Sequence, residues 1–215
     1  RMMSALEKCR KNGGTVVGIN PLQETGLRKF VDPQAPIEVL KGGTAIGNMH
    51  LPVRINGDIP LLKGIMRIML DAEDAAPGSV FDHEFINSRT EGFEDFLQEL
   101  RDVRIEDCVE RSGISRNQME AVAQLCIRNE KIIICWAMGI TQHKNGVANI
   151  QEIVNLLLLR GAIGKPGAGT CPVRGHSNVQ GDRTMGIWEK MPDSFLDRLD
   201  AHFDITVPRA HGYDT

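Results

Sequence analysis

The chain has 215 residues, 41% of them hydrophobic, and a formal net charge of -3 at pH 7. This length and composition can bury one large core and exclude a chain that is disordered throughout. The slight negative charge, without any basic block, gives no general attraction to nucleic acid or to an anionic membrane surface. We therefore expect no nucleic-acid binding. No apolar run approaches the length needed to cross a bilayer, so we also expect no membrane insertion.

The five cysteines indicate a reducing compartment. They are odd in number and widely spaced, and no two have the C-x-x-C spacing of a zinc or iron–sulfur site. We therefore expect no disulfide framework, no metal held by this chain alone and a cytoplasmic location. Residue Arg1 is not a start methionine, and the residues after it already have a helical pattern, so we expect an internal piece of a longer protein.

The predicted elements begin with a helix over 2–11, a break at Gly13-Gly14 and a β-branched strand over 15–19 that ends at Asn20-Pro21. Residues 22–52 predict a loop-rich stretch with at most a short helix. A second strand over 51–55 ends at a turn over 56–58, and apolar residues then recur at helical spacing. Strand, polar turn and helix in this order are typical of an open parallel sheet, which binds ligands at its carboxyl edge.

Packing helices fill the middle of the chain. Asp82 and Thr90 are each placed to cap a helix, and Ser115 with Gln118 forms a capping-box pattern before a third. The apolar faces of these helices indicate burial rather than chemistry. The run 131–136 predicts the most fully buried strand, and a helix with an apolar face over 150–158 follows, with Gly161 where a left-handed C-cap is expected.

The composition changes between residues 164 and 186 to glycine, proline and polar residues, which predicts a long Gly-rich loop. Such loops are unusual in a compact α/β protein unless they contact a ligand or another domain. No strong pattern follows after residue 188. The predicted fold class is therefore α/β, with a parallel Rossmann-like sheet, flanking helices and a long Gly-rich loop.

Three predicted strand ends present polar turns, over 20–23, 56–58 and 137–142. A carboxylate such as Asp58 can accept paired hydrogen bonds from a guanine edge or from ribose hydroxyls, and Asn20 and Gln142 offer both donors and acceptors. The alternative is that Asp58 and Asn20 only cap turns.

The run 173–183 places hydrogen-bond donors among glycines. Glycines let backbone amides approach an anionic ligand, Arg174 can bind an anion as a fork, and Gln180 can bind a heterocycle edge. The alternative is a polar surface loop with an ordinary salt bridge. The sequence has no G-x-G-x-x-G fingerprint, P-loop or G-x-S-x-G elbow, which disfavours the usual dinucleotide, nucleoside triphosphate and hydrolase functions.

Several ordered stretches strongly resemble the catalytic (alpha) subunits of molybdopterin oxidoreductases, in particular formate dehydrogenases. They are residues 85–86, 89–93, 136–143, 149–159, 161–169 and 172–181. The resemblance implies that residues 1–186 form an α/β domain that binds a molybdopterin guanine dinucleotide, and that 187–215 lead to a further domain. It also implies a bis-molybdopterin guanine dinucleotide cofactor with molybdenum or tungsten, and iron–sulfur ligands upstream of this chain.

The resemblance assigns roles residue by residue. Arg174 matches an arginine that lies beside the metal and helps to hold the substrate anion, and His176 can titrate near neutral pH beside it. We therefore predict Arg174 and His176 as catalytic residues. The predicted cofactor-binding residues are Asn20, Pro21, Leu22, Gln23, Glu24, Asn56, Gly57, Asp58, Met138, Gly139, Gln142, Arg174, Gly175, His176, Asn178, Gln180 and Gly181.

The chain departs from the family pattern at three places. The usual Asp-Pro-Arg turn appears as Asn20-Pro21-Leu22, the usual Arg-Gly-Gln appears as Arg174-Gly175-His176, and Asp182-Arg183 replace small residues after Gly181. These changes resemble a divergent branch of the family. They put in doubt formate as the substrate.

The resemblance implies a subunit that moves two electrons between a small substrate, with formate as the first candidate, and an acceptor. Its expected partners are the rest of the same subunit and an electron-transfer protein. This chain alone is expected to be inactive, because the metal ligand and the other pterin-binding domain lie outside the matched region. The alternative is a non-catalytic nucleotide-binding or subunit-interaction module, which the absence of C-x-x-C cysteines upstream would favour.

Overall fold

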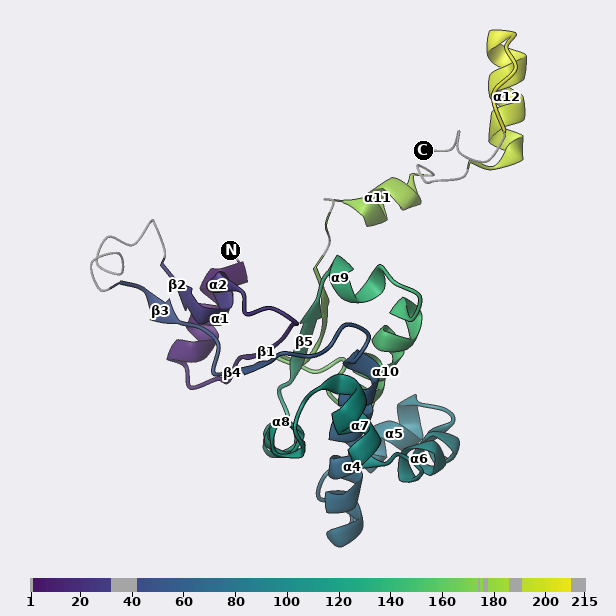
Figure 1. Cartoon of the computed structure of the whole chain (residues 1–215). Coiled ribbons are helices and arrows are strands. Elements are labelled where there is room, and N and C mark those ends of the chain that lie inside the picture. Colours follow the sequence, from purple (N-terminus) through teal and green to yellow (C-terminus); the bar gives the residue numbers. More distant parts are fainter. Residues whose placement is uncertain (1, 32–41, 174, 176–177, 186–190, 210–215) are drawn as a thin grey trace. The chain divides into compact units, whose positions relative to one another are not determined.

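A computed structural model describes residues 2–31, 42–173, 175, 178–185 and 191–209 (Figure 1). The chain divides into two compact units, Arg1–Cys171 and Pro172–Thr215. Helices and small sheets alternate along the first unit, which confirms the predicted α/β class. No described helix is long and apolar enough to cross a membrane.

The elements of the first unit follow one another as α1 (Met2–Lys11), β1 (Val17–Ile19), α2 (Thr25–Arg28), β2 (Lys29–Phe30), β3 (Thr44–Ala45), β4 (Met49–Leu51), α4 (Asp58–Ala75), α5 (His83–Arg89), α6 (Phe93–Arg101), α7 (Ile105–Ser112), α8 (Arg116–Arg128), β5 (Ile133–Trp136), α9 (Met138–Thr141), α10 (Gly146–Leu159) and β6 (Gly169–Pro172). The second unit contains α11 (Val179–Thr184) and α12 (Asp193–Phe203).

Helix α4 forms the centre of the hydrophobic core. Its apolar side chains recur at helical spacing, and Leu61, Ile65 and Met69 are fully buried. The helix packs against α6, α7, α8 and α10. A Cβ at Gly64 would lie 2.8 Å from Met119 Sδ and 3.1 Å from Cys108 Cβ, so glycine is required for this close approach.

The structure confirms most of the predicted helix ends. Asp82 accepts a hydrogen bond of 3.0 Å from the amide of Phe85, and both halves of the capping box at Ser115 are present. Gly161 has a φ of +53° just after α10, as its predicted C-cap role requires.

The predicted cap at Thr90 is wrong. Thr90 instead ends α5, where its Oγ1 donates to the carbonyl of Ile86 at 2.7 Å, and the left-handed Gly92 precedes α6. A threonine hydroxyl can bond to the carbonyl of the preceding turn as well as to an amide of the following one, so its presence does not distinguish a helix end from a helix start.

The described strands form two-stranded sheets. β1 pairs with β4 in parallel, with Val17 opposite Met49 and Ile19 opposite Leu51. β2 pairs with β3 antiparallel, and β5 pairs with β6. A single Rossmann-like sheet therefore remains a prediction.

The prediction of a fully buried strand over 131–136 is wrong. β5 alternates between exposed and half-buried residues, and Ile133 is 56% exposed. Its other face, with Ile134 and Trp136, packs against the core. The strand is continuously apolar, yet the described residues cover only one of its faces.

The segment 164–186 is more ordered than a long loop in its described part, since β6 and α11 lie within it. The sequence also gave no sign of α12, which Arg209 stabilises by ion pairs with Asp197 at 2.8 Å and Asp200 at 2.6 Å. Short helices of this kind depend on side-chain contacts that a periodicity search does not detect.

Candidate functional site

The parallel pairing of β1 and β4 brings their carboxyl ends together. The amide of Asn20, just after β1, donates to the carbonyl of Leu51 at 3.2 Å, and the Asn20 carbonyl lies 2.9 Å from His50 Nε2. The Asn20 side chain donates to Glu24 Oε1 at 3.2 Å. The predicted residues Pro21, Leu22 and Gln23 between them are exposed, so this turn presents its polar groups to the outside.

A small pocket of about 80 Å³ lies beside this turn, between the β1–β4 pair and α2. Gln23 and Glu24 line it together with His50. Its volume suits a few water molecules or one functional group of a ligand. A larger ligand would have to extend out of it across the exposed turn.

The turn between β4 and α4 is strained and closely packed. Asn56 has a φ of +65°, and Gly57 is buried. A Cβ at Gly57 would lie 2.8 Å from the Arg54 carbonyl oxygen and 2.9 Å from the Cα of Ser112. The prediction of a polar turn here is thus confirmed, and glycine is required by the backbone of two neighbouring segments.

Asp58 is the first residue of α4 and is half-buried. Burial raises the pKa of its carboxyl group above the ordinary value, while its own backbone amide and nearby His143 lower it in part. A half-buried carboxylate at a helix start is stabilised by further donors. A ligand that offers paired N–H or O–H groups would supply them.

The structure joins this turn to the segment after β5. Asn145 Nδ2 donates to Asn56 Oδ1 at 2.7 Å, and His143 is close enough to influence Asp58. The same segment carries the predicted residues Met138, Gly139 and Gln142, all exposed on or just after α9. Two of the predicted groups, separated by many residues in the chain, therefore share one edge of the first unit.

A buried asparagine on α10 bonds to the segment that forms this edge. Asn149 on α10 is fully buried, and its Nδ2 donates to the Ile140 carbonyl at 3.0 Å and lies 2.8 Å from His143 Nε2. Its Oδ1 is buried without a hydrogen-bond partner among the described residues. The contact holds the His143 ring beside the turn.

The roles of His143, Asn145 and Asn149 were not predicted from the sequence. His143 directly follows the predicted Gln142, and His143 and Asn149 lie within stretches that carry the family resemblance. Their polarity was the available signal, but which strand end they approach depends on tertiary packing.

The remaining predicted site residues, between 174 and 181, lie in the second unit. Gly175 and Gln180 are exposed, and Asn178, at a φ of +57°, precedes α11. Gly181 lies within α11. Arg174 and His176, the two predicted catalytic residues, lie outside the described residues.

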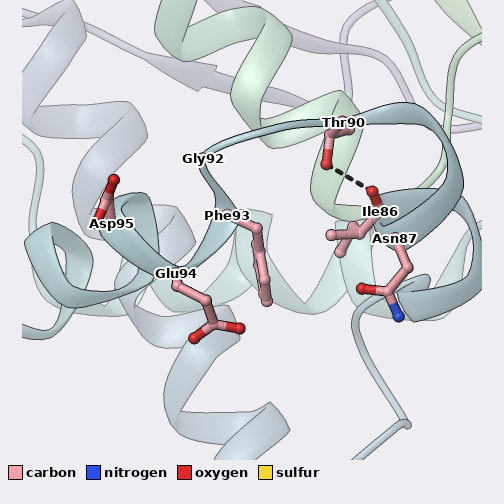
Figure 2. A pocket seen from close by; sticks show the side chains of 7 residues that line it. All are labelled: Ile86, Asn87, Thr90, Gly92, Phe93, Glu94 and Asp95. Carbon is pink, nitrogen blue, oxygen red and sulfur yellow. Dashed lines mark hydrogen bonds between the residues drawn. The ribbon is translucent and has the colours of Figure 1, made fainter.

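Figure 2 shows a different pocket, of about 280 Å³, between α5 and α6. Ile86 and Phe93 give it apolar walls, and Glu94 and Asp95 stand at its margin. None of the predicted site residues lines it. The strand-end edge gathers predicted site residues and this pocket gathers none, so that edge is the better candidate site.

The described residues contain no group of three or more histidine, cysteine, aspartate or glutamate side chains that could hold a metal ion. The strand-end edge is instead rich in amides, and its carboxylates are those of Asp58 and Glu24. That donor and acceptor set suits an organic ligand with hydrogen-bonding edges.

The close packing at Gly57 gives a first prediction. We expect Gly57→Ala to lower the free energy of unfolding by about 2 kcal/mol, because the new Cβ would clash with the backbone of Arg54 and Ser112. Urea denaturation would measure this change. Gly139→Ala is the matched control, since a Cβ there meets nothing within 4 Å, and an equal loss in both variants would contradict the explanation.

Comparison with known proteins shows that the chain is similar to segments of oxidoreductases. No protein-family model matches it. It is 49% identical over its full length to an "Uncharacterized oxidoreductase" of Mycobacterium tuberculosis, of which it covers 28%. It is 31% identical over 150 residues to "Formate dehydrogenase H" of Escherichia coli, covering 70% of this chain and 20% of that protein.

Among solved structures, acetylene hydratase from Pelobacter acetylenicus has a similar fold over 77% of this chain and 20% of its own, with a TM-score of 0.62 and 16% identity. That likeness concerns the fold alone. The chain spans little more than a quarter of the length of the mycobacterial relative.

Proposed function

We propose that this chain, which is homologous to one segment of oxidoreductases that include formate dehydrogenase H, forms the nucleotide-binding α/β domain of a molybdopterin-dependent oxidoreductase. The homology confirms the resemblance drawn from the sequence. In the proposed enzyme the domain belongs to a longer subunit, where further strands complete a Rossmann-like sheet and the Gly-rich residues of 164–186 contact the cofactor.

One observation carries the proposal. The turn 56–58 and the segment 138–145, which carry predicted cofactor residues, are brought together by the Asn145–Asn56 hydrogen bond and by the proximity of His143 to Asp58. Parallel pairing places the turn after β1 at the end of β4, which leads into 56–58. Ligands of open α/β sheets bind at such strand ends.

The residues present fit a guanine dinucleotide at this edge. Asp58 is half-buried with its pKa raised, which favours a ligand that donates two hydrogen bonds, as the N1 and N2 edge of guanine does. The turn 20–24 and the pocket beside it offer polar contacts for a ribose or phosphate group. Asn149 Oδ1 leaves one buried acceptor without a partner beside His143.

In the proposed enzyme, Asp58 would bind the guanine edge, and residues 20–24 would contact the rest of the nucleotide. Arg174 would hold the substrate anion, and His176 would accept or donate a proton near it. When bound, the metal–pterin cofactor would supply the two-electron chemistry. Upstream iron–sulfur ligands and a cytoplasmic electron-transfer partner complete this proposal, with formate as the first substrate to test.

The first experiment measures molybdenum, tungsten and guanine nucleotide in the protein as its cells make it, purified without oxygen. Metal together with about two guanine nucleotides per chain would support the proposal, as a bis-pterin cofactor requires. Protein without metal or nucleotide, from cells that make the cofactor normally, would contradict it and favour a non-catalytic module.

Asp58 gives a second prediction. We expect Asp58→Asn to weaken guanine nucleotide binding by about 30-fold, because an amide oxygen replaces a charged acceptor and an N–H₂ group faces the donors of the guanine. The measurement is the affinity of cofactor-free protein for guanosine diphosphate. Adenosine diphosphate, which has the same sugar and phosphates but a different base edge, is the comparison ligand.

Asp71→Asn on the same helix is the matched control, since Asp71 is exposed and pairs with Arg67. It should leave the guanosine diphosphate affinity unchanged. Equal affinities of the wild-type and Asp58→Asn proteins would remove Asp58 from the site.

A further inference from the structure

Two cysteines lie side by side on the paired strands β5 and β6. The backbone amide of Gly169, which begins β6, donates to the carbonyl of Ile132, which directly precedes β5, at 2.9 Å. Because the two strands are paired and start together, they run in the same direction. In that register Cys135 and Cys171 are level with each other, and their thiols are hydrogen-bonded.

The spacing of this pair suits a disulfide. Neighbouring strands lie about 4.8 Å apart, and disulfides join Cα atoms about 4.4 to 6.8 Å apart. Both cysteines are exposed in this chain, so an oxidant in solution can reach them. Among the other cysteines, Cys108 and Cys126 are buried on helices, and Cys9 lies on α1.

We propose that Cys135 and Cys171 are a redox-sensitive dithiol that forms a reversible cross-strand disulfide with low-molecular-weight disulfides as oxidant. The site does not depend on the proposed cofactor. A disulfide between adjacent strands must bring two Cβ atoms closer than the sheet spacing, so it is strained and easily reduced. Such reversible pairs are the kind that occurs in reducing compartments.

The exchange proceeds in two steps. The Cys171 thiolate attacks one sulfur of the oxidant, forming a mixed disulfide and releasing one small thiolate. The Cys135 thiolate then attacks Cys171 Sγ, forming the protein disulfide and releasing the second small thiol. The protein loses two protons and two electrons, and the oxidant is reduced to two thiols.

The order of attack follows from the environment of Cys135. Cys135 is exposed as a residue, but partial desolvation of its thiol, together with the neighbouring Cys171, raises its pKa to about 11. Few Cys135 thiolates exist at neutral pH, so the first attack is assigned to Cys171.

A disulfide here would tie together two stretches that lead to predicted cofactor residues. β5 leads directly into Met138, and β6 is followed along the chain by Arg174. Oxidation would fix the two strands to each other at the base of both stretches. The redox state of the pair would thus affect the chain at a place where ligand binding is proposed.

In the test, the protein is purified from its cells and reduced. It is then treated with oxidised glutathione at pH 7.5. Peptide mass mapping without reduction should show one cross-linked pair that contains Cys135 and Cys171, reversed by dithiothreitol. The free thiols of Cys135 and Cys171 should both be lost. Glutathione on Cys135 and Cys171 without a cross-link, or no reaction at either cysteine while Cys9 reacts, would overturn the proposal.

Two variants test the order of attack. In Cys135→Ser, Cys171 should keep the glutathione as a stable mixed disulfide, because the second thiol is absent. In Cys171→Ser, Cys135 should react at least about tenfold more slowly, given its scarce thiolate. Equal rates for the two variants would overturn the assigned order, and the mapping of the wild-type protein tests the disulfide itself without any variant.

Discussion

Substituting Glu73 by glutamine is expected to lower the free energy of unfolding by about 3 kcal/mol at pH 7. Glu73 on α4 is buried and accepts hydrogen bonds from the amides of Gly78, Val80 and Phe81 at 2.6, 2.8 and 3.0 Å. His83 Nε2 lies 2.7 Å from Oε1 of the same carboxyl group. Glutamine has the same shape but turns an N–H₂ group toward these donors, which leaves buried amides without an acceptor.

The loss should depend on pH. Burial raises the pKa of Glu73, but the hydrogen bonds from His83 and from the three amides outweigh burial and lower it from 4.5 to about 2. A lowered pKa in the folded state stabilises the protein fully above the unfolded value of 4.5. The stabilisation then falls as the pH decreases from 4.5 toward 2.

Urea denaturation of the wild-type and Glu73→Gln proteins between pH 3 and 7 would measure this dependence. The difference between them should be largest above pH 5 and shrink toward pH 3. Glu94→Gln, at an exposed position on α6, is the control and should change little. A difference that stays constant over the whole range would assign the loss to packing rather than to the charge.

The loop that Glu73 holds also explains how α4 and α10 are connected. Arg160, just after α10, donates to the carbonyl of Val80, and the Asp82 amide donates to the carbonyl of Leu159 at 2.9 Å. Glu73 on α4 therefore binds the loop at its amides, and Arg160 at the end of α10 binds it at a carbonyl. This arrangement places α5 and α6 against the core.

The helices could largely be predicted from the sequence, because their signals are local. Ser115 and Gln118 form the predicted capping box, and Asp82 caps α5 through the Phe85 amide. The spacing of apolar residues in α4 and α8 determined which faces are buried. Where two local rules competed, as at Thr90, the sequence did not distinguish a helix end from a helix start.

The arrangement of the strands could not be predicted in the same way. The apolar run 132–134 is equally suited to a strand covered on one face and to a strand covered on both, and Ile133 is exposed here. Pairing partners are set by contacts between residues far apart in the chain, such as Gly18 opposite His50. Composition alone contains no information about those contacts.

The candidate site was predicted in part. The sequence showed polar turns at 56–58 and 137–142, and the structure brings the first of them to the segment that follows the second through Asn145 and Asn56. The support from His143 and buried Asn149 was missed, because an asparagine in an apolar helix gives no sign of its partner. The roles of the individual predicted residues toward a ligand stay predictions.

Arg174 has the largest predicted effect on turnover, and the reason lies in its side chain and its neighbours in the chain. It stands in a run with Gly175 and Gly181, whose missing side chains let a ligand come close to the backbone. A guanidinium stays charged at any working pH and presents a planar fork to a carboxylate. The resemblance to formate dehydrogenases implies that this fork holds the substrate anion beside the metal.

We therefore expect Arg174→Ala in the intact, cofactor-loaded protein to lower kcat/KM for an anionic substrate by at least about 100-fold, a loss typical when one charged or hydrogen-bonding group is removed from a reacting anion. Arg174→Lys keeps the charge and loses the planar fork, so its kcat/KM should lie between that of the wild-type protein and that of Arg174→Ala. Metal and guanine nucleotide contents equal to those of the wild-type protein would show that the cofactor remains bound. Unchanged turnover in Arg174→Ala would mean that this arginine does not hold the substrate, whereas loss of the cofactor in the same variant would assign it to cofactor binding instead.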